Sequence, residues 1–134
     1  MGAVRGVRGA ITASENSREE ILRETRRLLE ALLISNDLML EDIAAAFFTV
    51  TDDIDAAFPA AAARELGWKW VPLMCSREIA VPGSLPMCIR VMLLVNTDLE
   101  SQSINHVYLG EAAALRPDLP DSAGDVNENS ADSD

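Results

Sequence analysis

The most regular hydrophobic pattern in the chain lies within residues 17–36. Apolar and threonine side chains recur there at the three- and four-residue spacing of one helix face, at Ile21, Thr25, Leu28 and Leu32. Ser17 and Glu20 fit a capping box, in which the hydroxyl and the carboxylate each accept a hydrogen bond from the other residue's backbone amide. The pattern predicts one long amphipathic helix that ends at Asn36-Asp37.

Five shorter segments have the alternation and the β-branched or aromatic content of strands. They are residues 4–11, 43–50, 68–75, 88–97 and 105–109. Pro72 indicates that the third of them lies at a sheet edge or carries a bulge, because proline cannot donate a ladder hydrogen bond.

Two further stretches favour short helices. Pro59 suits the first turn of an alanine-rich helix that runs to Leu66, with Gly67 at its end. Residues 111–115 are long enough for a single helical turn. The fold class that follows is α+β, a mixed sheet of about five strands with one long and one short helix.

Two helices can cover only one face of such a sheet, although several of its strands are apolar on both faces. In a chain this short, the obvious cover for the second face is another copy of the chain. We therefore expect self-association, with a small closed barrel or an under-covered sheet as the alternative.

Charge separates the chain into two regions. The 134 residues contain 22 acids and 11 bases, and the formal net charge is −11. Residues 117–134 hold six of the acids and none of the bases, so the rest carries 16 acids and 11 bases. We expect one domain over residues 1–119 and a disordered acidic tail over 120–134.

This composition excludes several classes of function. The body lacks the basic face that nucleic-acid binding needs, and six aromatic residues are few for stacking on bases. No apolar run approaches the ~20 residues of a membrane span, and no secretory signal is evident, so we expect a cytoplasmic protein with reduced cysteines. Cys75, Cys88 and His106 lack zinc-ligand spacing, and no phosphate-binding loop is present, which predicts no metal and no cofactor.

Arg90 is the most informative candidate for chemistry. It lies in the strand-like segment 88–97 among apolar residues, and a guanidinium in such a place requires an anionic partner. That partner is either an acid such as Glu78, which would make Arg90 a structural strut, or an anionic ligand in a pocket. The residues alone leave the two interpretations even.

The other candidates have ordinary interpretations when each is taken alone. Arg8 is either a surface arginine or a ligand contact with room left by neighbouring glycines, and Tyr108 is either an interface aromatic or a phenol donor. Cys75 has no histidine partner in a recognisable signature, which gives little support to covalent catalysis. Together with Glu78, the set suits an anionic small molecule held by hydrogen bonds.

Seven segments, in order and at matching spacings, resemble the monofunctional chorismate mutases of the AroH class. The segments are RGVRGA (5–10), FPAAAAREL (58–66), GW (67–68), VPLMCSREI (71–79), PGSLPMCIRV (82–91), NTD (96–98) and HVYL…LRPDL (106–119). The resemblance implies an α+β protomer that assembles as a homotrimer, with a pseudo-barrel of sheets and an active site in each cleft between subunits.

The resemblance also implies the reaction, the pericyclic rearrangement of chorismate to prephenate. By the family pattern, Arg90 donates to the ether oxygen and a carboxylate, and Glu78 accepts from the ring hydroxyl. Arg8 and Tyr108 bind the side-chain carboxylate. The pattern also implies substrate contacts from Met74, Cys75, Ser76 and Arg77, from Phe58, Ala60 and Arg64 of an adjacent subunit, and from Leu115 and Arg116 as a closing segment.

The sequence departs from the family pattern at one position, and two alternative functions remain. Family members often carry lysine where this chain has Ala61, and its absence predicts weaker substrate capture with the chemical step retained. A trimeric module that binds small carboxylates without converting them is the main alternative. A deaminase of the trimeric enamine/imine type, with Glu78 activating water, is a third.

Overall fold

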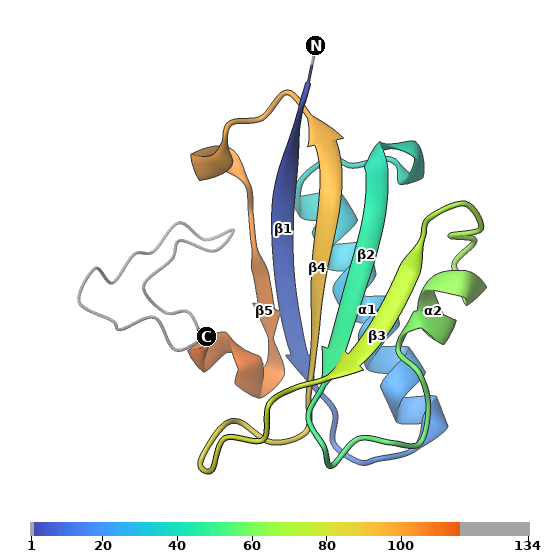
Figure 1. The fold of residues 1–134 in the computed structure, drawn as a ribbon, viewed down its shortest axis with the longest axis vertical. Coiled ribbons are helices and arrows are strands. Elements are labelled where there is room, and N and C mark those ends of the chain that lie inside the picture. Colours follow the sequence, from blue (N-terminus) through green and yellow to red (C-terminus); the bar gives the residue numbers. More distant parts are fainter. Residues whose placement is uncertain (1, 116–134) are drawn as a thin grey trace.

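The computed structural model describes residues 2–115 and forms a five-stranded sheet with two helices (Figure 1). The strands are β1 (Ala3–Thr12), β2 (Ile43–Val50), β3 (Leu73–Arg77), β4 (Cys88–Thr97) and β5 (Val107–Leu109). The helices are α1 (Arg18–Ser35) and α2 (Ala60–Glu65), with 3-10 turns η1 (Leu40–Asp42), η2 (Ser101–Ser103) and η3 (Gly110–Ala114). The predicted α+β class is confirmed.

The sheet is mixed, with the strand order β3-β2-β4-β1-β5. The central strand β4 is antiparallel to β1 and β2, while β3 runs parallel to β2 and β5 runs parallel to β1. Strand β3 is therefore at an edge, as Pro72 predicted.

The long helix follows the sequence prediction, with one correction at its start. Ser17 is the N-cap, and its hydroxyl accepts a hydrogen bond from Glu20 N at 3.2 Å. The Glu20 carboxylate does not return to the Ser17 amide, as a capping box requires. It accepts instead from the backbone N and the hydroxyl of Ser14, at 3.0 and 2.8 Å, because the turn after β1 brings Ser14 over the helix end.

Both helices pack against the same core on one face of the sheet; in Figure 1, α1 passes behind the strands and α2 lies beside β3. The core lies between the sheet and the two helices. Every second strand residue points into it, and Val7, Phe48 and Leu93 are at most 1% exposed. Helix α1 contributes Leu28 and Leu32 from the other side. Side chains at the intervening positions point to the opposite face, which we call the open face.

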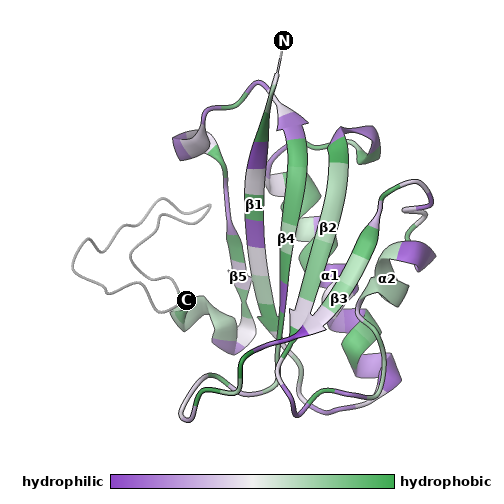
Figure 2. Cartoon of the chain, viewed as in Figure 1, coloured by the Kyte–Doolittle hydropathy of each residue, from purple (hydrophilic) through white to green (hydrophobic). Residues whose placement is uncertain are grey.

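The open face is apolar along much of its length. Phe47 and Met74, which are paired across β2 and β3, are 40% and 60% exposed, and Val4 is 58% exposed. Met92 and Leu94 of β4 are half-buried on the same face. Figure 2 shows that the strands are mostly hydrophobic along their length, with core-facing and open-face residues both coloured. The expectation that the helices leave one apolar face uncovered is confirmed for the single chain.

The predicted bounds of two strands are wrong, and β3 ends at Arg77 instead of residue 75. Strand β3 begins at Leu73 instead of residue 68, because Trp68 turns into the core with 2% exposure and its amide closes the end of α2 on Ala63 O at 3.0 Å. Strand β5 covers Val107–Leu109 alone. Gly67, with φ +92°, ends α2 as predicted.

Three sequence predictions fall on residues that the structure does not describe: the acidic tail over 120–134, the last residues of the 1–119 domain, and Arg116. Within residues 2–115, no helix is long and apolar enough to span a membrane.

Candidate active site

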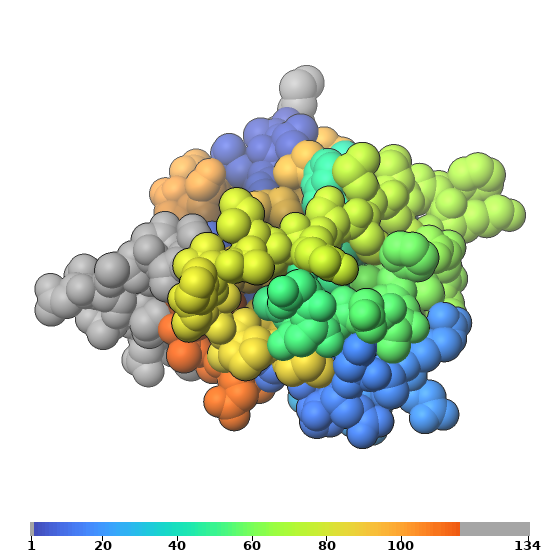
Figure 3. Space-filling model, turned by 60° about the horizontal axis from the view of Figure 1, so that its bottom comes forward, coloured from blue at the N-terminus to red at the C-terminus, as the bar shows by residue number. Residues whose placement is uncertain are grey.

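Arg90 lies on the open face near the start of β4, at the end of the sheet where several loops meet. In the register of the sheet it is opposite Thr49 of β2 on one side and Ala10 of β1 on the other. Its side chain is 25% exposed. Figure 3, with this end forward, shows the yellow segment 78–87 beside the orange η3 and the green residues after β2.

Glu78 approaches Arg90 from the segment that follows β3. Its backbone N donates to Val50 O at 2.8 Å, and its carboxylate is 28% exposed. The Thr49 hydroxyl donates to Glu78 Oε2, and the same oxygen lies 3.7 Å from Arg90 Nε. Glu78 is thus an ionic partner of Arg90, at a distance longer than a charge-assisted hydrogen bond of about 2.7–2.9 Å.

A pocket of about 560 Å³ adjoins this pair. Its lining comprises Thr51, Glu78, Ile79, Val81, Pro82, Gly83, Ser84, Leu85, Arg90, Ala114 and Leu115. The walls are mostly apolar, so the charges of Arg90 and Glu78 are only partly screened by water. We call this space the Arg90 pocket.

A small apolar cluster supports the Arg90 pocket on the side of η3. Its buried members are Ala10, Cys88, Ala112 and Leu115, with Leu85 and Tyr108 packed against them. Burial raises the pKa of the Cys88 thiol, although the Arg90 guanidinium acts in the opposite direction. Cys88 is therefore a packed, neutral thiol, which does not suit a nucleophile.

Arg8 and Tyr108 share the open face with Arg90. Arg8 is paired with Met92 of β4, and Tyr108 is paired with Ala10, which is itself opposite Arg90. Residues directly opposite one another in a sheet point to the same side. The backbone N of Arg8 also donates to His106 Nδ1 at 3.0 Å, which gives the single histidine a structural role.

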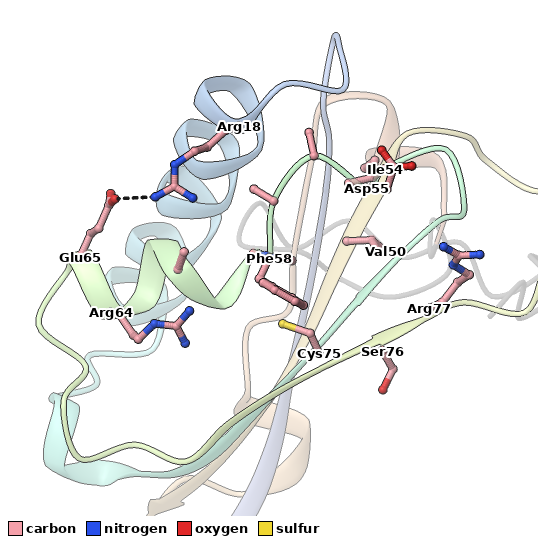
Figure 4. Close-up of a pocket in the computed structure, with 14 residues that line it drawn as sticks. Arg18, Val50, Ile54, Asp55, Phe58, Arg64, Glu65, Cys75, Ser76 and Arg77 are labelled. Carbon is pink, nitrogen blue, oxygen red and sulfur yellow. Dashed lines mark ion pairs between the residues drawn. The ribbon is translucent and has the colours of Figure 1, made fainter.

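A second, larger pocket of about 820 Å³ lies between α2, β3 and the segment after β2 (Figure 4). Phe58 and Cys75 point toward each other across it, and Arg64 and Arg77 contribute positive charge to its walls. Phe58 is 69% exposed. We call this space the Phe58 pocket.

Asn16 holds the loop that presents Phe58. Its side-chain oxygen accepts from the backbone amides of Asp55 and Ala56, both at 3.0 Å, and its amide donates to Asp55 Oδ1 at 2.8 Å. Arg18 of α1 lies at the pocket rim, 3.7 Å from Glu65 of α2.

Within one chain, most of the predicted site residues line two separate pockets. Arg90, Glu78 and Leu115 line the Arg90 pocket, while Phe58, Arg64, Cys75, Ser76 and Arg77 line the Phe58 pocket. Met74 and Ala60 line neither pocket. Met74 is exposed on the open face, and Ala60 is 4% exposed and packs into the core. Ala61, the next residue, lines the Phe58 pocket instead of Ala60.

Sequence reasoning missed three residues near Arg90. Thr49 contacts Glu78, and Thr51 accepts from Cys88 N at 3.0 Å. Asp53 accepts from Met87 N at 3.0 and 3.2 Å and holds Met87 at φ +54°, just before β4 begins. A polar residue close to the end of an apolar strand is a weak signal, and only the strand register connects Thr49 with Arg90.

The arrangement can hold an anionic ligand by a fixed cation with a carboxylate acceptor beside it. Among residues 2–115, no group of three or more histidine, cysteine, aspartate or glutamate side chains is placed to hold a metal ion. Arg90 and Glu78 can supply hydrogen bonds and electrostatic stabilisation to such a ligand.

Comparison with known proteins identifies the family. The profile described as chorismate mutase type I matches residues 4–119. "Chorismate mutase AroH" from Thermus thermophilus is 53% identical over 117 residues, which cover 87% of this chain and 96% of the relative. The Bacillus subtilis protein of the same name is 46% identical over 117 residues, with 87% and 92% covered.

A solved structure agrees with these sequence relatives. The structure described as a chorismate mutase from Clostridium thermocellum superimposes with a TM-score of 0.81 at 53% sequence identity, covering 82% of this chain and 98% of that one. The fold and the ordered set of arginine, glutamate and tyrosine positions therefore have one consistent explanation: this chain belongs to the chorismate mutase type I family.

Proposed function

We propose that the protein is a chorismate mutase that rearranges chorismate to prephenate, the branch-point step toward phenylalanine and tyrosine. The observation that carries the proposal is that Arg90 of β4 and Glu78 of the segment after β3 line the same pocket, 3.7 Å apart and only 25% and 28% exposed. The names of the relatives support the reaction.

The reaction requires no covalent bond between the substrate and the protein. As the ether C–O bond of the substrate breaks, a C–C bond forms within the same molecule, so no atom, proton or electron pair is exchanged with the protein. Partial negative charge develops on the ether oxygen. A protein accelerates such a step by holding the reactive conformer and by placing positive charge where the negative charge develops.

The residues of the open face fit those tasks. Arg90 is fixed by the central strand, and we assign its guanidinium to the ether oxygen and one substrate carboxylate. Glu78 accepts from the ring hydroxyl. Arg8 and Tyr108, on the same face by register, bind the side-chain carboxylate.

We further propose that the working form is a homotrimer. The apolar open face needs cover, and a second chain seated there would also complete the site. In this arrangement Phe58 and Arg64 of one subunit reach the Arg90 pocket of its neighbour, and Ala61 takes the place of the buried Ala60. The segment Met74–Arg77 would then line the cleft between them.

The same proposal gives the remaining assignments. The catalytic domain comprises residues 1–119, Leu115 and Arg116 close over the site, no cofactor takes part, and the enzyme acts in the cytoplasm. The reaction needs only a dianionic substrate and the fixed charges around it.

The test is conversion of chorismate, followed by the loss of its absorbance and by identification of prephenate. Replacing Arg90 by citrulline keeps the side-chain shape and removes the charge. We expect kcat to fall by at least about 10²- to 10³-fold, the effect of losing one preorganised donor, and by more because a full charge is lost.

Arg5 provides a matched control for this experiment. It is a half-buried strand arginine whose Nε donates to Leu99 O at 3.1 Å, and citrulline retains that donor. Citrulline at position 5 should leave turnover close to wild type. Chorismate binding without prephenate formation would overturn the proposal in favour of a carboxylate-binding module.

A further inference from the structure

We propose that Thr49 is a positioning residue for this site: its hydroxyl orients the Glu78 carboxylate and keeps it from closing to hydrogen-bond distance on Arg90. The inference rests on the proposed function and names a residue that the site needs in addition to those assigned above. Thr49 acts through Glu78 and is given no contact with the substrate.

The sheet fixes Thr49 in the required place. Its position in β2 is directly opposite Arg90 in the antiparallel pairing with β4, and opposite Ser76 in the parallel pairing with β3. All three residues therefore point to the open face. The neighbouring Val50 O accepts the Glu78 backbone amide at 2.8 Å, so the backbone of Glu78 is anchored one residue away from the hydroxyl that binds its carboxylate.

We attribute the distance between Glu78 and Arg90 to this contact. An unrestrained arginine–carboxylate pair closes to about 2.7–2.9 Å, and more readily where water is partly excluded. Here the two side chains are 28% and 25% exposed, yet Oε2 remains 3.7 Å from Arg90 Nε. The oxygen nearest to Arg90 is the one that accepts the Thr49 hydrogen bond.

The separation of the two groups matters because, in the proposed function, Arg90 donates to the ether oxygen of the substrate and Glu78 accepts from its ring hydroxyl. A closed pair would direct an Arg90 donor to Glu78 and would neutralise part of the charge needed at the ether oxygen. With Oε2 fixed by Thr49, Oε1 is the oxygen that can accept a substrate hydroxyl. Loss of the Thr49 hydroxyl should allow Glu78 to move onto Arg90.

The test compares Thr49→Val with Thr49→Ser. Valine has the shape of threonine without its hydroxyl and is well tolerated in strands, whereas serine keeps the hydroxyl. We expect valine to lower kcat by about tenfold with a smaller change in KM, and serine to retain most of the wild-type kcat. Thr49→Ala serves as the hydroxyl-free variant if valine prevents folding.

A double-mutant cycle checks that Thr49 works through Glu78. In a Glu78→Gln background, Thr49→Val should have little further effect, because the carboxylate that it orients is gone. Serine as impaired as valine, or an undiminished valine effect in the Glu78→Gln background, would overturn the inference. Wild-type kcat in the folded valine variant would do the same.

A crystal structure of Thr49→Val separates this inference from the proposed function. The Glu78–Arg90 separation should fall from 3.7 Å to hydrogen-bond distance, whether or not the protein turns over chorismate. An unchanged separation would refute the role of Thr49. Absence of turnover by the wild-type protein would refute the proposed function alone.

Discussion

Replacing Glu20 by glutamine should lower the free energy of unfolding by about 2 kcal/mol at pH 7. The carboxylate is 7% exposed and accepts from the backbone N and hydroxyl of Ser14, and it also pairs with Arg23. The residue after β1, Ala13, donates in turn to Met87 O at 2.9 Å. Glu20 therefore secures the turn that packs against the loop leading to Arg90.

The magnitude follows from the change in three hydrogen bonds. Glutamine can still accept a bond from Ser14, but each bond to the carboxylate is about twice as strong as its neutral counterpart, a difference of about 0.5–1 kcal/mol. The contribution of Arg23 is discounted because that side chain is 60% exposed and its charge is screened by water. The sum is about 2 kcal/mol, or several degrees in Tm for a domain of this size.

The effect depends on pH in a defined direction. A hydrogen bond from the Ser14 backbone amide lowers the pKa of Glu20 below its ordinary value of 4.5; burial acts in the opposite direction, and the Ser14 hydroxyl, Arg23 and Arg27 add to the lowering. The stabilisation is therefore complete above the pKa of the unfolded chain and is lost as the pH falls through the lower folded pKa. The difference between wild type and Glu20→Gln should shrink below about pH 4.

Urea unfolding at fixed protein concentration, at pH 7 and at a series of acid values, measures this difference. Glu19→Gln is the matched control, because Glu19 lies in the same first turn of α1 but is exposed. It should cost only a few tenths of a kcal/mol through the helix dipole. Equal costs for the two variants, or a Glu20 effect that persists unchanged at acid pH, would refute the reasoning.

Two other variants test the substrate pocket and the assembly. Ala61→Lys places a cation at the Phe58 pocket and should lower KM for the dianion about three- to tenfold with kcat little changed, whereas Ala61→Met should not. An unaltered KM in steady-state kinetics would show that this position does not face the ligand. Phe47→Asp puts a charge on the open face and should shift the mass measured by light scattering toward the monomer, whereas Glu30→Asp, on the exposed side of α1, should leave it unchanged.

The sequence predicts the elements whose signals are local. The leucine stripe and the Ser17 cap define α1 within its own residues, and Gly67 ends α2 because its φ of +92° favours glycine. The uncovered sheet face also follows from the sequence, since one long helix and one short helix cannot cover both sides of five strands. Each of these inferences needs composition and spacing but no tertiary contact.

Other features depend on contacts that the sequence does not display. The run beginning at Trp68 has the composition of a strand, yet Trp68 packs into the core and delays β3 to Leu73. The separation of Cys75 from Arg90 onto opposite faces, and the contact of Thr49 with Glu78, both follow from the strand register. The register is set by how strands distant in the sequence pair with one another, and the spacing of residues along the sequence does not reveal that pairing.

Complementation between two impaired variants tests most directly whether the site is shared between subunits. Arg90→Ala removes the cation of the Arg90 pocket, and Arg64→Ala removes one from the Phe58 pocket. In the proposed trimer, each site takes Arg90 from one subunit and Arg64 from its neighbour. When equal amounts of the two variants mix at random, each of these arginines is present with a chance of one half, so about one quarter of the sites contain both. Co-refolded mixtures should therefore recover about a quarter of wild-type chorismate turnover, whereas turnover no higher than the mean of the separate variants would contradict a site built from two chains.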